Sequence, residues 1–131
     1  MLIFIDIPDT IMPRISINIV IEERGITMIK PITGTENFDA AIAKGDVVVG
    51  FSAPWCGFCR KIRPVMEKIS GEMDIPFYGI NIDEDKELAE RYNVETIPDI
   101  FFFRDGKPLG SIIGYGNVGY KELKEFFAQY R

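Results

Sequence analysis

Cys56 and Cys59 are the only cysteines in this chain of 131 residues, and the chain contains no histidine. A structural zinc site needs four ligands, usually Cys or His, so this pair supplies half of one. An iron–sulfur cluster also takes four cysteines unless two chains share it, and a Cys–His nucleophile requires an imidazole. Two thiols with two residues between them therefore favour dithiol–disulfide exchange, in which one thiolate attacks a disulfide and the other resolves the mixed intermediate.

Length and composition predict a globular domain without a nucleic-acid partner. The chain is long enough to bury a core, and 47% of its residues are hydrophobic, which excludes a disordered protein. Its net charge of −5, with no cluster of Lys and Arg, argues against binding to nucleic acid. Met1–Ile7 is apolar but lacks the basic start and the cleavage site of a signal peptide. With no long apolar run and a single reversible cysteine pair, we expect a cytoplasmic protein without a membrane span.

Strand and helix patterns alternate from about Gly25 onward. Thr35 is a candidate N-cap of the first helix, Pro64 should kink the second, and Asp105-Gly106 predicts a hairpin turn. The order β-α-β-α-β-α-β-β-α predicts an α/β fold, with a mixed central sheet covered by helices on both faces. Strands are predicted at 26–32, 46–52, 77–82, 100–103 and 109–113, and helices from Thr35, from Cys59 to Met73, from Asp83 to Tyr92, and from Tyr120 to Tyr130.

Residues 1–25 form a separate N-terminal β extension by this interpretation. Apolar Ile15, Ile17, Ile19 and Ile21 recur at every second position, which is typical of a half-buried strand. Two roles stay open for the extension. It could shield an edge of the sheet within one molecule, or it could pair with a second copy to make a dimer.

The chain from about Gly25 to its C-terminus resembles the thioredoxin family, which makes residues 26–131 a thioredoxin-like domain. Cys56-Gly57-Phe58-Cys59, preceded by Trp55, is similar to the family's Trp-Cys-Gly-Pro-Cys site. Five further features match in order: Pro64 in the following helix, Asn81-Ile82-Asp83 at a strand end, Thr96-Ile97-Pro98 in the loop of a cis-proline, Phe103-Arg104-Asp105-Gly106 in the hairpin, and Gly114 beside the substrate groove.

The resemblance implies a thioredoxin fold and the reduction of protein disulfides. Cys56 would be the nucleophile at a helix N-terminus, where a thiolate is favoured, and Cys59 the more buried resolving thiol. No bound cofactor or metal is implied. The implied partners are disulfide-containing proteins and an electron donor similar to thioredoxin reductase. The implied docking surface consists of Trp55, Gly57, Phe58, Ile97, Pro98 and Gly114.

Other functions stay open from the sequence. A disulfide oxidant or isomerase of the same fold, a redox-dependent binding module, a metal-bridged dimer and an inert structural disulfide would all contain this cysteine pair. Phe58 favours the oxidant or isomerase, because it stands where the family has a proline and its members become less reducing without that proline.

Three further positions near the dithiol bear on its chemistry. Gly50 and Gly79 replace the family's buried aspartate and its lysine partner. Asp99 follows Pro98 where the family usually has threonine, and it is a possible proton relay or a source of repulsion toward Cys56. Basic Arg60, Lys61 and Arg63 either assist the thiolate or form a solvated helix face, and Tyr115 either lines the groove or packs on the hairpin.

Overall fold

The computed structural model describes residues 20–22, 25–27, 29–114 and 116–131. Its centre is a five-stranded mixed sheet with the strand order β3-β5-β4-β6-β7. β3, β5 and β4 run parallel to one another, while β6 is antiparallel to both β4 and β7. The strands are β3 (Ile29–Pro31), β4 (Asp46–Ser52), β5 (Phe77–Asn81), β6 (Asp99–Arg104) and β7 (Lys107–Ile113).

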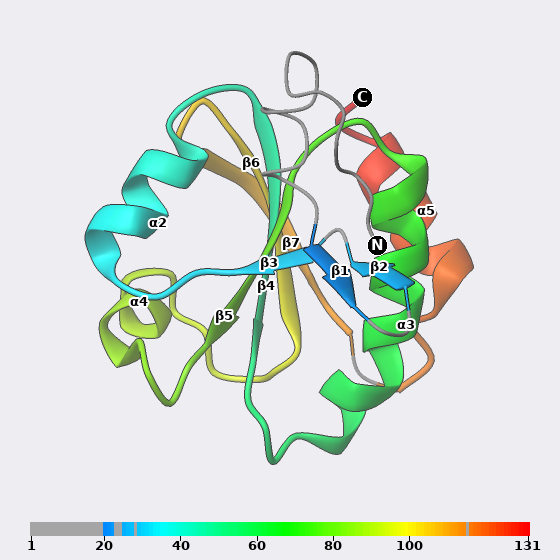
Figure 1. The fold of residues 1–131 in the computed structure, drawn as a ribbon, viewed down its shortest axis with the longest axis horizontal. Coiled ribbons are helices and arrows are strands. Elements are labelled where there is room, and N and C mark those ends of the chain that lie inside the picture. The colour runs from blue at the N-terminus through cyan, green and yellow to red at the C-terminus, as the bar shows by residue number, and fades with distance from the viewer. Residues whose placement is uncertain (1–19, 23–24, 28, 115) are drawn as a thin grey trace, which may run out of the picture.

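In the described part of the chain, helices cover both faces of this sheet (Figure 1). On one side lie α2 (Thr35–Ile42) and α4 (Lys86–Arg91), and on the other lie α3 (Gly57–Glu72) and α5 (Tyr120–Ala128). The observed order from β3 to α5 confirms the predicted order of strands and helices. The thioredoxin-like architecture with helices on both faces is likewise confirmed.

Alternation along the central strand β4 separates the two cores. Val47, Val49 and Phe51 belong to the core under α2 and α4, whereas Val48 belongs to the core under α3 and α5. Because successive side chains of a strand point to opposite faces, an uninterrupted apolar strand can supply both cores. The prediction that 46–52 is a strand covered on both sides is therefore confirmed.

The predicted strand 26–32 is wrong as a single element. Gly25–Thr27 forms β2, which pairs antiparallel with β1 (Val20–Glu22) in a separate two-stranded sheet. Ile29–Pro31 forms β3, which pairs with β5 at the edge of the main sheet. The run is divided because its two parts have different partner strands. The expected boundary after residue 25 thus falls inside β2, and the alternating pattern at 15–19 lies outside the described residues.

Smaller differences arise where local hydrogen bonds compete with helical ones. α2 is preceded by Gly34 as its N-cap rather than by Thr35. Gly34 has a φ of 94°, a value that glycine adopts readily. The helix predicted from Asp83 begins only at Lys86, because the Asn81 side chain accepts the Asp83 N–H at 2.9 Å and forms a turn first. The Asp105-Gly106 hairpin is confirmed, with positive φ at both residues.

Candidate active site

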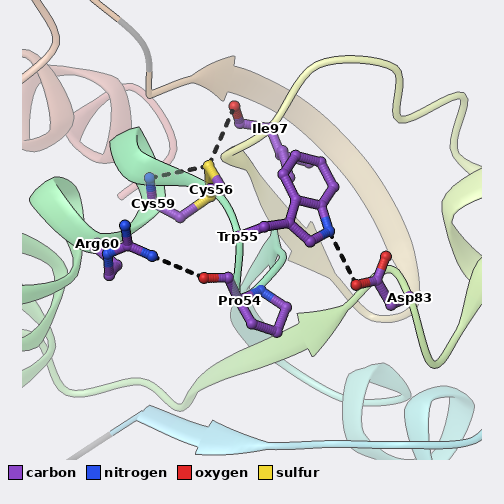
Figure 2. Close-up of a disulfide and its surroundings, with 7 residues drawn as sticks. All are labelled: Pro54, Trp55, Cys56, Cys59, Arg60, Asp83 and Ile97. Atoms are coloured by element: carbon purple, nitrogen blue, oxygen red, sulfur yellow. Dashed lines mark hydrogen bonds between the residues drawn. A yellow bond between two sulfur atoms is a disulfide. The ribbon is translucent and has the colours of Figure 1, made fainter.

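The N-terminus of α3 holds a Cys56–Cys59 disulfide (Figure 2). Cys56 is the N-cap of the helix, and its Sγ accepts the Cys59 backbone N–H at 3.1 Å. The helix begins at Gly57, two residues earlier than predicted, because this sulfur caps its first turn. The helix also continues through Pro64. The position of Cys56 confirms that the pair lies where unpaired N–H groups and the helix dipole favour negative charge on sulfur.

The two cysteines are buried to nearly the same extent. Cys56 is 6% exposed and Cys59 is 8% exposed, so the expectation that Cys59 is the more buried thiol is wrong for the disulfide form. Both pack in one cluster with Ala53, against which Ile82 and Ile97 also lie. The Ile97 loop therefore covers Cys56, which sequence spacing along one helix did not reveal.

The loop before β6 brings the peptide bond between Ile97 and Pro98, which is cis, beside the disulfide. The Ile97 carbonyl oxygen lies 3.9 Å from Cys56 Sγ, within reach of a donated S–H in the reduced protein. Gly114 N–H donates to the Pro98 carbonyl at 2.8 Å. A Cβ on Gly114 would stand 2.5 Å from Ile62 Cδ1 and 3.1 Å from Pro98 Cγ, so a larger residue here would require these side chains to shift. The structure thus brings Cys56, Ile97, Pro98 and Gly114 together, as predicted.

Exposed aromatic side chains flank the disulfide. Trp55 is 65% exposed and Phe58 is 41% exposed, large fractions for apolar side chains. The Trp55 indole Nε1–H donates to Asp83 Oδ2 at 3.0 Å (Figure 2). Sequence reasoning did not assign Asp83 to the site. Its position just after β5, parallel to β4, was the available signal, because parallel neighbouring strands end at one edge of the sheet.

The basic side chains of the first two turns of α3 have different contacts. Arg60 Nη1 donates to the Pro54 carbonyl at 2.8 Å and so fastens the turn before the dithiol (Figure 2). Arg63 pairs with Glu67 at 3.2 Å one turn along the helix, and Lys61 is exposed. Of the three, only Arg60 is thus tied to the segment that carries Cys56. Tyr115 lies outside the described residues.

Asp99 is a buried carboxyl at the start of β6. It is 6% exposed, and its Oδ1 has no hydrogen-bond partner among the described residues. It pairs in register with Phe51 and Ile113, and it shares its side of β6 with Phe101. Burial in this apolar setting raises the pKa of Asp99 from 3.8 to about 6. The carboxyl therefore changes charge close to neutral pH.

Gly50 and Gly79 lie next to each other in the sheet. They are register partners on β4 and β5, and Pro31 and Ile100 continue the row on either side. A Cβ on Gly50 would meet no atom within 4 Å. Where the family has a carboxylate and an amine, the described residues leave open space at Gly50 and an ordinary contact with Ile29 at Gly79. The joint loss is physically reasonable, since either group alone would be a buried, unpaired charge.

Metal ligands do not gather in the part of the chain that the structure describes. No group of three or more Cys, Asp, Glu or His side chains there has the arrangement of a metal site. Within the same residues, no helix combines the length and the apolar character that crossing a bilayer requires.

Comparison with known proteins gives one consistent result. The family model described as Thioredoxin matches residues 30–129. The thioredoxin of Chlamydia pneumoniae is 43% identical over 84 residues, which cover 63% of this chain and 82% of that protein. Thioredoxin-2 of Saccharomyces cerevisiae is 33% identical over 98 residues, or 72% of this chain and 94% of the yeast protein.

Solved structures agree with the sequence matches. A mutant thioredoxin from Halobacterium salinarum superimposes with a TM-score of 0.71 at 27% identity, covering 78% of this chain and 89% of that one. The thioredoxin of Schistosoma mansoni also reaches 0.71, covers 79% of this chain and 95% of that one, and at 22% identity supports the fold alone. This chain therefore belongs to the thioredoxin family, and it is a protein-disulfide reductase whose redox-active disulfide joins Cys56 to Cys59.

Proposed function

We propose that Cys56 is the nucleophile and Cys59 the resolving thiol. The Cys56 thiolate attacks a substrate disulfide, forms a mixed disulfide and releases one substrate thiolate. The Cys59 thiolate then attacks the Cys56 sulfur, which regenerates the Cys56–Cys59 disulfide and releases the second substrate thiolate. Two electrons pass from the dithiol to the substrate. The observation that carries this assignment is the place of Cys56 at the N-cap of α3, where the Cys59 N–H points at its sulfur.

The docking surface we propose surrounds Cys56. Its backbone component is Ile97, along which an extended substrate segment would pair by strand addition. Exposed Trp55 and Phe58 would contact apolar substrate side chains, and glycines at 57 and 114 would let the substrate backbone approach closely. The proposed surface consists of Trp55, Gly57, Phe58, Ile97, Pro98 and Gly114.

Turnover tests this assignment. With dithiothreitol as the electron donor, the chain should reduce insulin disulfides many times over, and Cys56→Ser should abolish the reaction. Cys59→Ser should instead accumulate a mixed disulfide with substrate, because the first attack proceeds without a resolving thiol. A trapped complex with Cys56→Ser but not with Cys59→Ser would reverse the two roles.

Phe58 supports a second candidate within the same chemistry, a disulfide oxidant or isomerase. A less stable disulfide would transfer oxidising equivalents to substrates more readily. A redox titration against glutathione separates the candidates, since a reductant needs the more negative potential. For the reductase, we propose that the electron donor is a protein similar to thioredoxin reductase and that the working compartment is the reducing cytoplasm.

We propose Asp99 as the group that exchanges a proton with the dithiol. Its support is burial, the absence of a hydrogen-bond partner for Oδ1 among the described residues, and its place directly after the loop that covers Cys56. A carboxyl with a pKa of about 6 can both accept and donate near neutral pH. In Asp99→Asn, the pH–rate profile of disulfide reduction should lose its acidic limb, and an unchanged profile would remove Asp99 from the mechanism.

Residues 1–25 are proposed as an extension to the domain formed by 26–131. β3 comes first in the strand order of the main sheet, so an added strand could pair beside it. Light scattering on the full chain and on one beginning at Met28 separates a dimerising role from an edge-covering one. A dimer mass that falls to a monomer mass on truncation supports dimerisation, and two monomer masses exclude it.

A further inference from the structure

A cavity of about 450 Å³ lies between α3 and the sheet, behind the disulfide. Its floor includes Gly50 and Gly79, which are register partners and present no side chains. Val48, two residues before Gly50, lies in the same core cluster as Ile62 and Met66 of α3, so the glycines are on the side of the sheet that faces this helix. The cavity thus exists because two neighbouring positions on one face of the sheet lack side chains.

The interior of the cavity is apolar. Buried Ile62, Met66 and Ile100 line it, and so does the buried Cys59. A volume of this size falls in the range of sites that enclose small organic ligands, about 300–1,000 Å³.

The rim of the cavity is cationic. Arg60 and Arg63 line it and are exposed, and no Asp or Glu is among the described residues that line it. Arg63 is paired with Glu67, but no acidic side chain of the described residues pairs with Arg60. Arg60 donates through Nη1 to the Pro54 carbonyl, which leaves its other N–H groups for a planar anion (Figure 2).

We propose that this cavity is a binding site for an amphipathic carboxylate, with the apolar chain between α3 and the Gly50–Gly79 pair and the carboxylate on Arg60. Each buried methylene should strengthen binding about fourfold, and a carboxylate matches the fork of N–H donors that a guanidinium presents. The site is independent of the proposed roles of Cys56 and Cys59, since it requires only the cavity and its rim. An occupied cavity would nonetheless place the ligand in contact with Cys59.

Titration of the full chain with decanoate, at concentrations below micelle formation, tests the proposal by calorimetry and by amide NMR. Saturable binding should shift the amide signals of Gly50, Gly79 and Arg60 and leave Gly71, at the far end of α3, in place. Octanoate, two methylenes shorter, should bind about fifteenfold more weakly. Decanol, which lacks the charge, should bind about tenfold more weakly than decanoate.

Matched variants locate the ligand. Gly50→Leu fills the cavity and should abolish binding, whereas Gly71→Leu, also with open space around its Cβ, should not change it. Arg60→Gln should weaken decanoate about tenfold, and Lys61→Gln, one residue on and outside the lining, should have no effect.

Several results would overturn the proposal. Absence of saturable decanoate binding to the full chain would do so. This holds even if the reason is that other residues of the chain, or a second copy, fill the cavity. If both leucine variants alter binding, or if neither does, the ligand binds elsewhere. Equal affinity for decanol and decanoate would exclude a carboxylate site. If Gly50→Leu does not fold, the comparison of Arg60→Gln with Lys61→Gln and the NMR shifts still show whether decanoate binds in this cavity.

Discussion

The two faces of the central sheet differ in how completely they are packed, and two neighbouring residues of β4 show the difference. On the α2 and α4 face, Phe51 is fully buried among aromatic rings, with Phe101 at 5.4 Å and Tyr92 at 6.3 Å between ring centroids. On the α3 face, the preceding residue is Gly50, and a cavity lies above it. β4 therefore has one face that is filled along the strand, and another, the open face, that is filled at Val48 and open at Gly50.

This difference separates stability from chemistry. The aromatic cluster contributes large buried areas and edge-to-face contacts, such as Tyr92 with Phe103 at 5.4 Å, and both are stabilising. The open face carries the dithiol at the N-terminal end of α3. The cavity next to Cys59 leaves this part of the face less tightly packed. We infer that the stability of the fold depends more on packing at the filled face than on packing around Gly50 and Gly79, next to the dithiol.

The largest expected effect tests that inference directly. Phe103→Ala removes a fully buried ring, and it should lower the free energy of unfolding by about 3–5 kcal/mol. Gly50→Ala is the matched change on the open face. Its added Cβ has free space, so stability should change by less than about 1 kcal/mol. Urea denaturation measures both, and comparable losses from the two variants would contradict the contrast between the faces.

Apolar runs in the sequence predicted the strands of the filled face well, because a strand buried on both faces is apolar at successive positions. Phe51, Phe101 and Phe103 lie in predicted strands, and all are in the core. For the open face, the sequence showed only that two side chains are missing. Glycine at 50 and 79 indicated a lost charge pair, but nothing local showed that these residues are register partners, since pairing between β4 and β5 depends on tertiary structure.

At the site, sequence reasoning succeeded where a motif fixes geometry and failed where contacts come from distant segments. Cys56 at the helix N-terminus and Pro98 beside it followed from the family pattern. The hydrogen bond from Trp55 to Asp83 joins residues 28 positions apart, at the ends of the neighbouring strands β4 and β5. That contact requires the strand order of the sheet, which the linear pattern does not give.

The second prediction concerns Asp99, a carboxyl that is buried on the filled face. Because the pKa of Asp99 is raised from 3.8 to about 6, the folded state binds its proton more tightly than the unfolded state. The contribution of Asp99 to the free energy of unfolding should therefore fall as pH rises through this range, by about 3 kcal/mol over the whole titration at about 1.36 kcal/mol per unit. Asp99→Asn, which keeps the shape without the charge, should remove this loss.

The measurement is urea denaturation of both proteins in the reduced and oxidised states at pH 4 and pH 7.5. Asp99→Asn should be more stable than the wild type at pH 7.5 and similar at pH 4. A matched Asp39→Asn change, at an exposed carboxyl paired with Arg91, should not reproduce this pattern. If the wild type and Asp99→Asn keep the same difference at both pH values, Asp99 is not the buried titrating group.

A third prediction addresses the dithiol itself. The potential of the wild type should lie between about −270 mV, the thioredoxin value, and about −180 mV, that of protein disulfide isomerase. In Phe58→Pro, proline would restrict the loop of the dithiol form, so closing the disulfide would cost less entropy. The potential should become more negative by about 30 mV, or about 1.4 kcal/mol. Equilibration with glutathione measures this, and a wild-type value at or below −270 mV would refute the prediction.

The smallest expected effect lies at the exposed edge of the site, where Trp55 donates to Asp83. Asp83→Asn keeps an acceptor oxygen but loses its charge, so the hydrogen bond should weaken by less than about 1 kcal/mol. Asp83→Ala removes the acceptor and should release the ring. If the bond positions Trp55 for substrate, Asp83→Ala should raise KM for insulin a few-fold with little change in stability, and Asp83→Asn should lie between Asp83→Ala and the wild type. Because this hydrogen bond is exposed, a large loss of stability in either variant would show that the edge of the site supports the fold, and would contradict the separation of stability from chemistry.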